Sequence, residues 1–115
     1  MKKIERLRVL GKYLVSGAVN EAEFDMGKWP SCAVGEARHI PSLSNEGFTF
    51  DESDRWPLYN GSTDFEACAE FFGLPFNKTR ELFGADKDTN SGNHSTAIQV
   101  GKRILRYLKR KGKSK

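Results

Sequence analysis

The sequence predicts an all-α fold: a single small domain of four or five helices with long irregular connectors. Three observations support this prediction. Apolar residues recur at helical spacing near both ends of the chain and in its centre. The central stretch, residues 64–84, has the pattern of an αα-hairpin, in which a tight turn joins two short helices. The chain has 115 residues, enough for one domain with one modest core. We therefore expect at most a minor two-stranded hairpin beside the helices.

The first expected helix covers residues 2–19. Its basic residues, including Arg6 and Arg8, lie mostly off the apolar stripe and face water or a partner. The chain begins with basic residues, as a signal peptide does, but further charges interrupt the apolar run that such a peptide needs. We therefore expect a mature helix and a cytoplasmic protein. The stripe is formed by residues three or four positions apart: Ile4, Leu7, Gly11, Leu14 and Ala18.

Two segments separate this helix from the centre of the chain. Ser31 is placed to cap a helix over residues 32–40, and Pro41 is placed to end it. This helix is rich in small residues, which let a neighbouring helix approach closely. Residues 42–62 look irregular, with one short strand expected around Phe48.

The central hairpin carries its own start and stop signals. Thr63 and Glu66 have the spacing of a capping box, in which each side chain bonds the backbone amide of the other residue. Gly73 stands where a helix commonly ends in a left-handed residue, and Pro75 is well placed to open the next helix. These signals predict two helices within residues 64–84.

The hairpin also resembles the DNA-binding helix-turn-helix. Ala69 stands four residues before the turn glycine, where that motif needs a small residue because its helices cross closely. Under this interpretation the second helix is a recognition helix that offers Asn77, Lys78 and Arg80 to a groove. The alternative interpretation is a plain αα-hairpin that only packs a helical core.

The last expected helix begins with a second capping box, Thr96 with Gln99. We assign residues 1–110 to the helical domain and residues 111–115 to a basic tail, which we expect to be disordered. The outer side of the last helix consists of cations: Lys102, Arg103, Arg106, Lys109 and Arg110.

The net charge of +4 conceals an uneven distribution. Residues 1–12 carry +4 and residues 102–115 carry +8, whereas residues 13–101 carry −8. Basic ends on an acidic body suit a nucleic-acid contact made by the ends. They also suit terminal helices that pack on the acidic middle and are neutralised by it.

Reactive and metal-binding residues do not form a specific motif. A nucleophilic cysteine needs a base within hydrogen-bond reach, but His39 lies seven residues after Cys32, about 10 Å along a helix. A zinc site built from these two residues with Cys68 and His94 lacks the short-spaced ligand pair that structural zinc sites usually have. We therefore expect buried thiols, no catalytic residue and no metal.

One loop has some features of a calcium site. Asp86, Asp88 and Asn90 place oxygen ligands at alternate positions. The glycine and the glutamate that a helix-loop-helix calcium loop requires are replaced by Ser91 and Ala97. We expect a solvated turn and no cofactor.

A pattern of core and turn residues extends over roughly residues 4–108. Its members are Phe24, Met26, Trp29, Cys32, Gly35 and Ala37, followed by Ala69, Phe72, Gly73, Leu74, Leu82 and Phe83. The pattern resembles a group of small bacterial and phage-borne proteins of unassigned function, in which an FxMxxW segment precedes a helix rich in Cys, Ala and Gly. Many of them carry a Cys-Gly-Thr step where this chain has Pro30, Ser31 and Cys32. The resemblance implies a fold and a bacterial or phage origin rather than an activity.

Our leading expectation is a small intracellular, non-enzymatic binding protein that contacts nucleic acid through its basic terminal helices. One alternative is an inhibitor or accessory factor of a mobile element that binds a host or phage protein, using the acidic middle or an aromatic flap around Trp56 and Tyr59. A third is an enzyme that uses Cys32. No apolar run is long enough for a membrane span, so we expect no membrane partner. The expected nucleic-acid contacts are Arg6, Arg8, Asn77, Lys78, Arg80, Lys102, Arg103, Arg106, Lys109 and Arg110.

Overall fold

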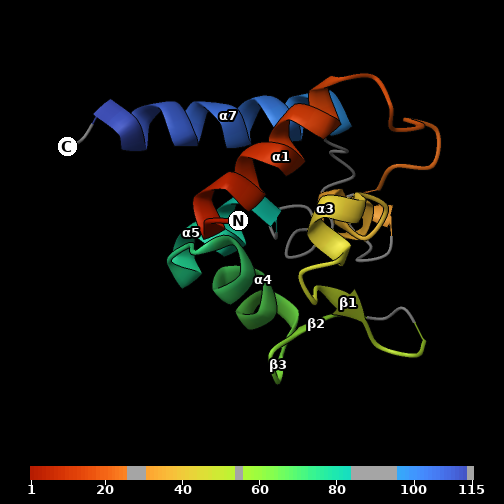
Figure 1. The fold of residues 1–115 in the computed structure, drawn as a ribbon. Helices are drawn as coiled ribbons and strands as arrows, with labels where there is room; N and C mark the ends of the chain where they lie inside the picture. The colour runs from red at the N-terminus through yellow and green to blue at the C-terminus, as the bar shows by residue number, and fades with distance from the viewer. Residues whose placement is uncertain (26–30, 54–55, 84–95, 114–115) are drawn as a thin grey trace.

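Six helices and three short strands form the described part of the chain, which the computed structural model gives as residues 1–25, 31–53, 56–83 and 96–113. In chain order the elements are α1 (Lys3–Val15), α2 (Ala33–Ala37), α3 (Pro41–Ser44), β1 (Thr49–Phe50), β2 (Pro57–Tyr59), β3 (Ser62–Thr63), α4 (Asp64–Phe72), α5 (Phe76–Phe83) and α7 (Ala97–Lys113). Helices α1 and α7 lie at one end of the molecule and the strands lie at the other, with α4 and α5 between them (Figure 1).

The expectation of an all-α fold with four or five helices is wrong, because the chain also forms a three-stranded antiparallel sheet. Strand β2 is central: Leu58 pairs with Thr49 of β1 on one side and with Thr63 of β3 on the other. Asn60 and Gly61 join β2 to β3, and both have positive φ, 51° and 85°, as a two-residue hairpin turn requires. Strands of two or three residues are too short to show a period of two in the sequence, so at most a minor two-stranded hairpin was expected and the third strand was missed.

Helices α1 and α7 cross at two glycines. A Cβ atom on Gly101 would lie 2.7 Å from Val15 Cγ1 and 2.9 Å from the carbonyl oxygen of Gly11. A Cβ atom on Gly11 would lie 3.0 Å from Ile104 Cγ2. The first and last helices therefore pack together at a distance that requires glycine at position 101 (Figure 1).

The predicted αα-hairpin is present. Gly73, with φ of 67°, ends α4, and the Leu74 amide donates to the carbonyl oxygen of Ala69 at 2.9 Å. The predicted capping box at the start of α4 is absent, because Thr63 belongs to β3 and its side chain makes no capping hydrogen bond. Phe76, at the start of α5, is 49% exposed.

Two helices are shorter than predicted. Helix α1 ends at Val15 because Gly17, with φ of 88°, adopts the left-handed conformation. Helix α2 ends at Ala37, and Pro41 begins α3 instead of ending α2, since the fixed φ of proline suits a first helical position. Cys32 precedes α2 and is buried, as expected.

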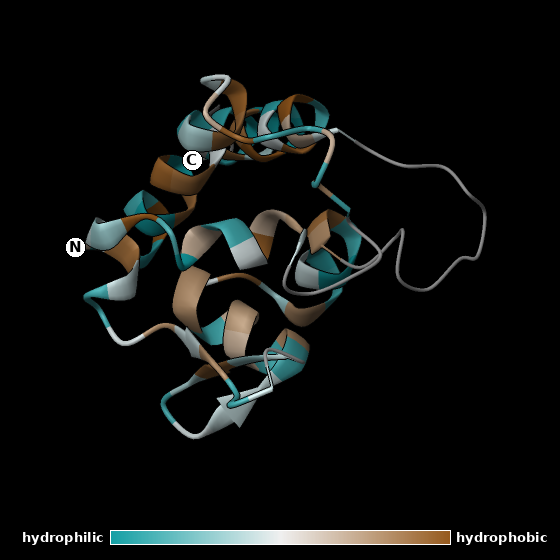
Figure 2. Ribbon diagram, turned by 90° about the vertical axis from the view of Figure 1, so that its right-hand side faces the viewer, coloured by the Kyte–Doolittle hydropathy of each residue, from teal (hydrophilic) through white to brown (hydrophobic). Residues whose placement is uncertain are grey.

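Four phenylalanines form the centre of the core. The rings of Phe48 and Phe71 stack with centroids 4.6 Å apart, and Phe72 lies 5.8 Å from Phe83. These contacts join the segment before β1 to α4 and α5. Brown hydrophobic and teal hydrophilic residues alternate along the longer helices in Figure 2, as expected for helices with one face toward the core and one toward water.

Candidate nucleic-acid interface

Helix α7 is anchored at its N-terminus by three side chains. The predicted capping box is confirmed: the Gln99 amide donates to Thr96 Oγ1 at 3.1 Å, and the Thr96 amide donates to Gln99 Oε1 at 2.9 Å. The Ala97 amide donates to Glu21 Oε1 at 2.8 Å, which places a carboxylate at the positive end of the helix dipole. The start of the helix is thereby fixed to a segment 76 residues earlier in the sequence.

One side of α7 faces the core and the other side is basic. We call the exposed cations Lys102, Arg103, Arg106, Lys109 and Arg110 the α7 basic face. The helix contains no acidic residue. Within the described parts of the chain, Lys102, Arg106 and Lys109 have no ion-pair partner. The buried side consists of Ala97, Val100, Gly101, Ile104 and Leu108.

A recess of about 160 Å³ lies between α5 and α7, and we call it the α5–α7 furrow. Lys78 Nζ lies 2.8 Å from Glu81 Oε2 and 5.4 Å from the centroid of the Tyr107 ring. Four cations against one carboxylate leave the furrow with a net charge of +3. Its lining residues are Lys78, Glu81, Leu82, Arg103, Arg106, Tyr107 and Arg110.

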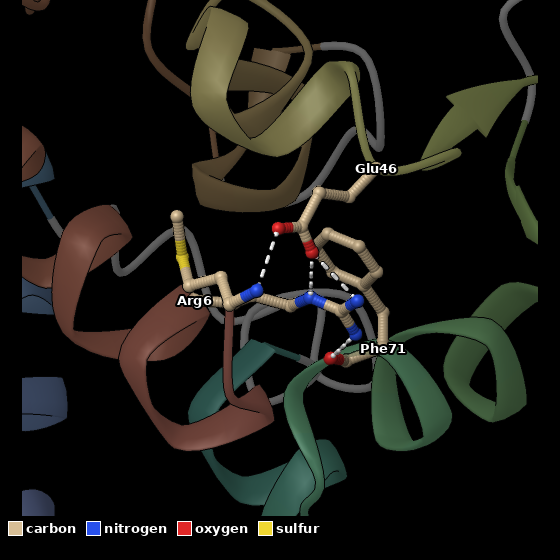
Figure 3. A network of polar contacts seen from close by, with 4 residues as sticks. Arg6, Glu46 and Phe71 are labelled. Carbon is tan, nitrogen blue, oxygen red and sulfur yellow. Dashed lines mark hydrogen bonds and ion pairs between the residues drawn. The ribbon is translucent and has the colours of Figure 1, made fainter.

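Arg6, a predicted contact residue, lies in the interior and is only 9% exposed. Figure 3 shows its guanidinium between the carboxylate of Glu46 and the carbonyl oxygen of Phe71. Arg6 Nε donates to Glu46 Oε2 at 2.7 Å, Nη1 donates to the Phe71 oxygen at 2.9 Å, and the guanidinium carbon lies 4.3 Å from the Phe71 ring centroid. The hydrogen bond from Arg6 holds the pKa of Glu46 below its usual value, and the amine of Met1, 3.3 Å from Glu46 Oε1, also lowers it. Arg6 therefore joins α1 to α4 and to the segment after α3.

Arg8, the other predicted contact on α1, is half-buried and forms an ion pair with Glu5, one turn away on the same helix. The structure thus packs the two basic helices together, but Arg6 lies in the interior and Arg8 is paired with Glu5.

The three predicted contacts on α5 do not share one face. Asn77 is exposed, Lys78 turns toward Tyr107 on α7, and the guanidinium of Arg80 lies 5.2 Å from the ring centroid of Phe65 on α4. A recognition helix must present its contact residues to the same groove. This arrangement favours the plain αα-hairpin, with Lys78 contributing to the furrow beside α7.

Tyr107 is the furrow residue that the sequence interpretation missed. Arg103, Arg106, Tyr107 and Arg110 are spaced at positions i, i+3, i+4 and i+7, so they share one helical face. That spacing was a usable signal, but the prediction named only the charged residues on the outer side of the helix.

The other chemical candidates gain no support from the described residues. Cys32 and Cys68 are both buried thiols and are not joined in a disulfide, while His39 is exposed. No group of three or more His, Cys, Asp or Glu side chains among the described residues is arranged to hold a metal ion. Asp86, Asp88, Asn90, Ser91 and His94 lie outside the described residues. None of the helices in the described residues has the length and apolar character needed to cross a membrane.

Comparison of the chain with protein-family models, with curated proteins and with solved structures finds no match in any of the three.

Proposed function

We propose that this chain is a small, non-enzymatic nucleic-acid-binding protein of bacterial or phage origin that works in the cytoplasm. The α7 basic face and the furrow beside it form the contact surface. The observation that carries the proposal is that all five predicted cations of α7 are exposed on a helix without acidic residues. Phosphate neutralisation requires clustered cations of this kind.

The proposal differs from the expectation drawn from the sequence in the role of α1. Arg6 stabilises the fold, and Arg8 is occupied by Glu5. The contact is therefore made by one basic helix, α7, with α1 as its support. The Gly11–Gly101 crossing holds α7 against the body while its outer side stays accessible.

A gel-shift titration at about 50 and 200 mM salt tests the proposal. If each of the five cations of the α7 basic face meets one duplex phosphate, affinity falls roughly 500-fold between these salt concentrations. A variant with Lys102→Ala, Arg106→Ala and Lys109→Ala leaves two such contacts, so its affinity falls only about 10-fold over the same range.

A matched control removes three cations from α1 instead: Lys2→Ala, Arg8→Ala and Lys12→Ala. Both variants lose the same charge, so a difference between them reports the position of the cations and not the net charge. We expect the α1 variant to keep the salt dependence of the parent protein. No binding by the parent protein at the lower salt concentration would refute the proposed function.

One observation favours a second candidate function, a binding module for a protein partner. Phe76 is half-exposed, and it borders a surface hollow that also includes Phe65, Asp64, Glu66 and Arg80. An exposed aromatic ring with charged neighbours is typical of protein contact surfaces. The aromatic flap expected from the sequence is less suitable, because the ring centroid of Tyr59, from that segment, lies 4.9 Å from that of the buried Phe71.

A further inference from the structure

The α5–α7 furrow is formed by one face from each of two helices. Arg103, Arg106, Tyr107 and Arg110 line it from α7, and Lys78 and Leu82 line it from α5. Its volume of about 160 Å³ corresponds to about five water molecules. The recess therefore has room for one flat ring or one phosphate group, but not for a double helix.

The furrow combines cationic, aromatic and apolar side chains. Guanidinium groups bind phosphate oxygens through several donors, and an aromatic ring offers a face on which a base can stack. Leu82, which is 5% exposed, provides an apolar wall behind them. A surface that only neutralised phosphates would need no aromatic ring and no recess.

Lys78 does not close the furrow. Its ammonium lies 5.4 Å from the Tyr107 ring centroid, near the limit of about 6 Å at which a ring attracts a cation. Its side chain is 30% exposed. It can therefore turn from the ring to a phosphate oxygen when a base enters, while Glu81 remains within reach of its ammonium.

We infer that the furrow holds the base of one unpaired nucleotide of a single strand, stacked on Tyr107, while the phosphate of that nucleotide lies at the edge of the furrow and is bound by the arginines of α7. This inference rests on the proposed function and names its substrate class. Bases of a duplex are stacked inside the helix and cannot reach Tyr107, whereas those of a single strand are free to stack on side chains. The divergent directions of Lys78 and Arg80 on α5 agree with it, since α5 does not offer a groove-reading face.

The test compares binding of an oligothymidylate of about 16 nucleotides, near the upper end of single-strand site sizes, with binding of a duplex of equal length. The variants are Tyr107→Leu, which removes the aromatic face but keeps an apolar side chain, and Tyr107→Phe, which keeps the face. Phe76→Leu is the matched control, because Phe76 is an exposed aromatic residue of α5 that lies outside the furrow. Thermal melts of all variants establish that they fold.

The parent protein should prefer the single strand. Tyr107→Leu should weaken single-strand binding at least about fivefold and leave duplex binding unchanged, since base stacking contributes at least that factor. Tyr107→Phe and Phe76→Leu should bind like the parent protein.

Equal losses for single strand and duplex in Tyr107→Leu would overturn the inference, because they would reveal a structural role for the ring. Unchanged single-strand binding in a folded Tyr107→Leu variant would also overturn the inference. In that case, salt-dependent binding through the α7 basic face would still support the proposed function. Absence of all binding by the parent protein would refute the proposed function and the inference together.

Discussion

Helices α1 and α7 are both basic and pack against each other, yet the arginines of α1 are placed differently from the cations of α7. In α1, Arg6 is buried among Glu46 and Phe71, and Arg8 is paired with Glu5. In α7 the five cations of the α7 basic face remain on the surface, and the helix itself contains no acidic residue. The comparison shows that a basic run in a sequence does not indicate a binding surface until the burial and the partners of each side chain are known.

The largest expected effect on stability comes from replacing Arg6, which is buried, whereas the cations of α7 are exposed. Arg6→Ala should lower the free energy of unfolding by about 2–4 kcal/mol, because it removes a charged hydrogen bond to a buried carbonyl and a contact with the Phe71 ring. Lys102→Ala, on the exposed side of α7, should change it by no more than about 0.5 kcal/mol. Urea denaturation measures both values. Equal stabilities would show that the interior role assigned to Arg6 is wrong.

The next effect concerns the crossing of the two helices. Gly101→Ala should destabilise the protein by about 1–3 kcal/mol, because the added methyl group meets the Gly11 backbone and Leu14 Cβ, both at 2.9 Å. This cost exceeds the gain in helix propensity, which is at most about 1 kcal/mol.

Gly11→Ala serves as the matched control for this crossing. Its methyl group would meet only the side chains of Ile104 and Leu105, both at 3.0 Å, and these can shift. Thermal unfolding of the two variants should therefore show the smaller loss for Gly11→Ala. A more stable Gly101→Ala variant would mean that the helices do not pack at this distance.

The two helices also differ at their N-termini. Helix α7 has a capping box, whereas no side chain makes a capping hydrogen bond at the start of α1. Thr96→Ala should cost about 1 kcal/mol in urea denaturation, while Lys2→Ala at the N-cap of α1 should cost little. If Thr96→Ala were neutral, the anchoring of α7 would depend on Gln99 and Glu21 and not on the Thr96 hydroxyl.

A smaller effect, the pH dependence of stability, tests the pairing of Arg6 with Glu46. The pKa of Glu46 is lowered in the folded protein from the value of 4.5. A lowered pKa contributes stability that is fully present above pH 4.5 and is lost as the pH falls through the folded-state pKa. The stability difference between the parent protein and Glu46→Gln should therefore be constant near neutral pH and shrink below pH 4.5. A difference that grows on acidification would contradict the Arg6–Glu46 pairing.

Local signals in the sequence predicted local structure well. Gly73 ends a helix and Thr96 begins one, because each feature depends on residues within a few positions. The capping box predicted from Thr63 and Glu66 is wrong, because pairing with Leu58 places Thr63 in a strand. The backbone of Asp64 then has φ of 60°, outside the geometry that the capping box needs.

The candidate site could be predicted only where it depends on residues that are close together in the sequence. The exposed cations of α7 follow from helical periodicity, and their exposure is as expected. The interior position of Arg6 depends on Glu46 and Phe71, which lie 40 and 65 residues away in the sequence. The furrow depends on the packing of α5 against α7, so the meeting of Lys78 with Tyr107 could not be read from either helix alone.

The most direct test of the contrast between the two helices compares two single arginine substitutions, Arg106→Ala in α7 and Arg8→Ala in α1. Both remove one positive charge, and both should leave the free energy of unfolding within about 0.5 kcal/mol of the parent value. The measurement is the slope of the logarithm of the nucleic-acid binding constant against the logarithm of the salt concentration. We predict that Arg106→Ala makes this slope shallower by about 0.7 for a single strand or about 0.9 for a duplex, and that Arg8→Ala leaves it unchanged. Equal changes in the two variants, or a change in Arg8→Ala alone, would contradict the assignment of binding to α7 and of support to α1.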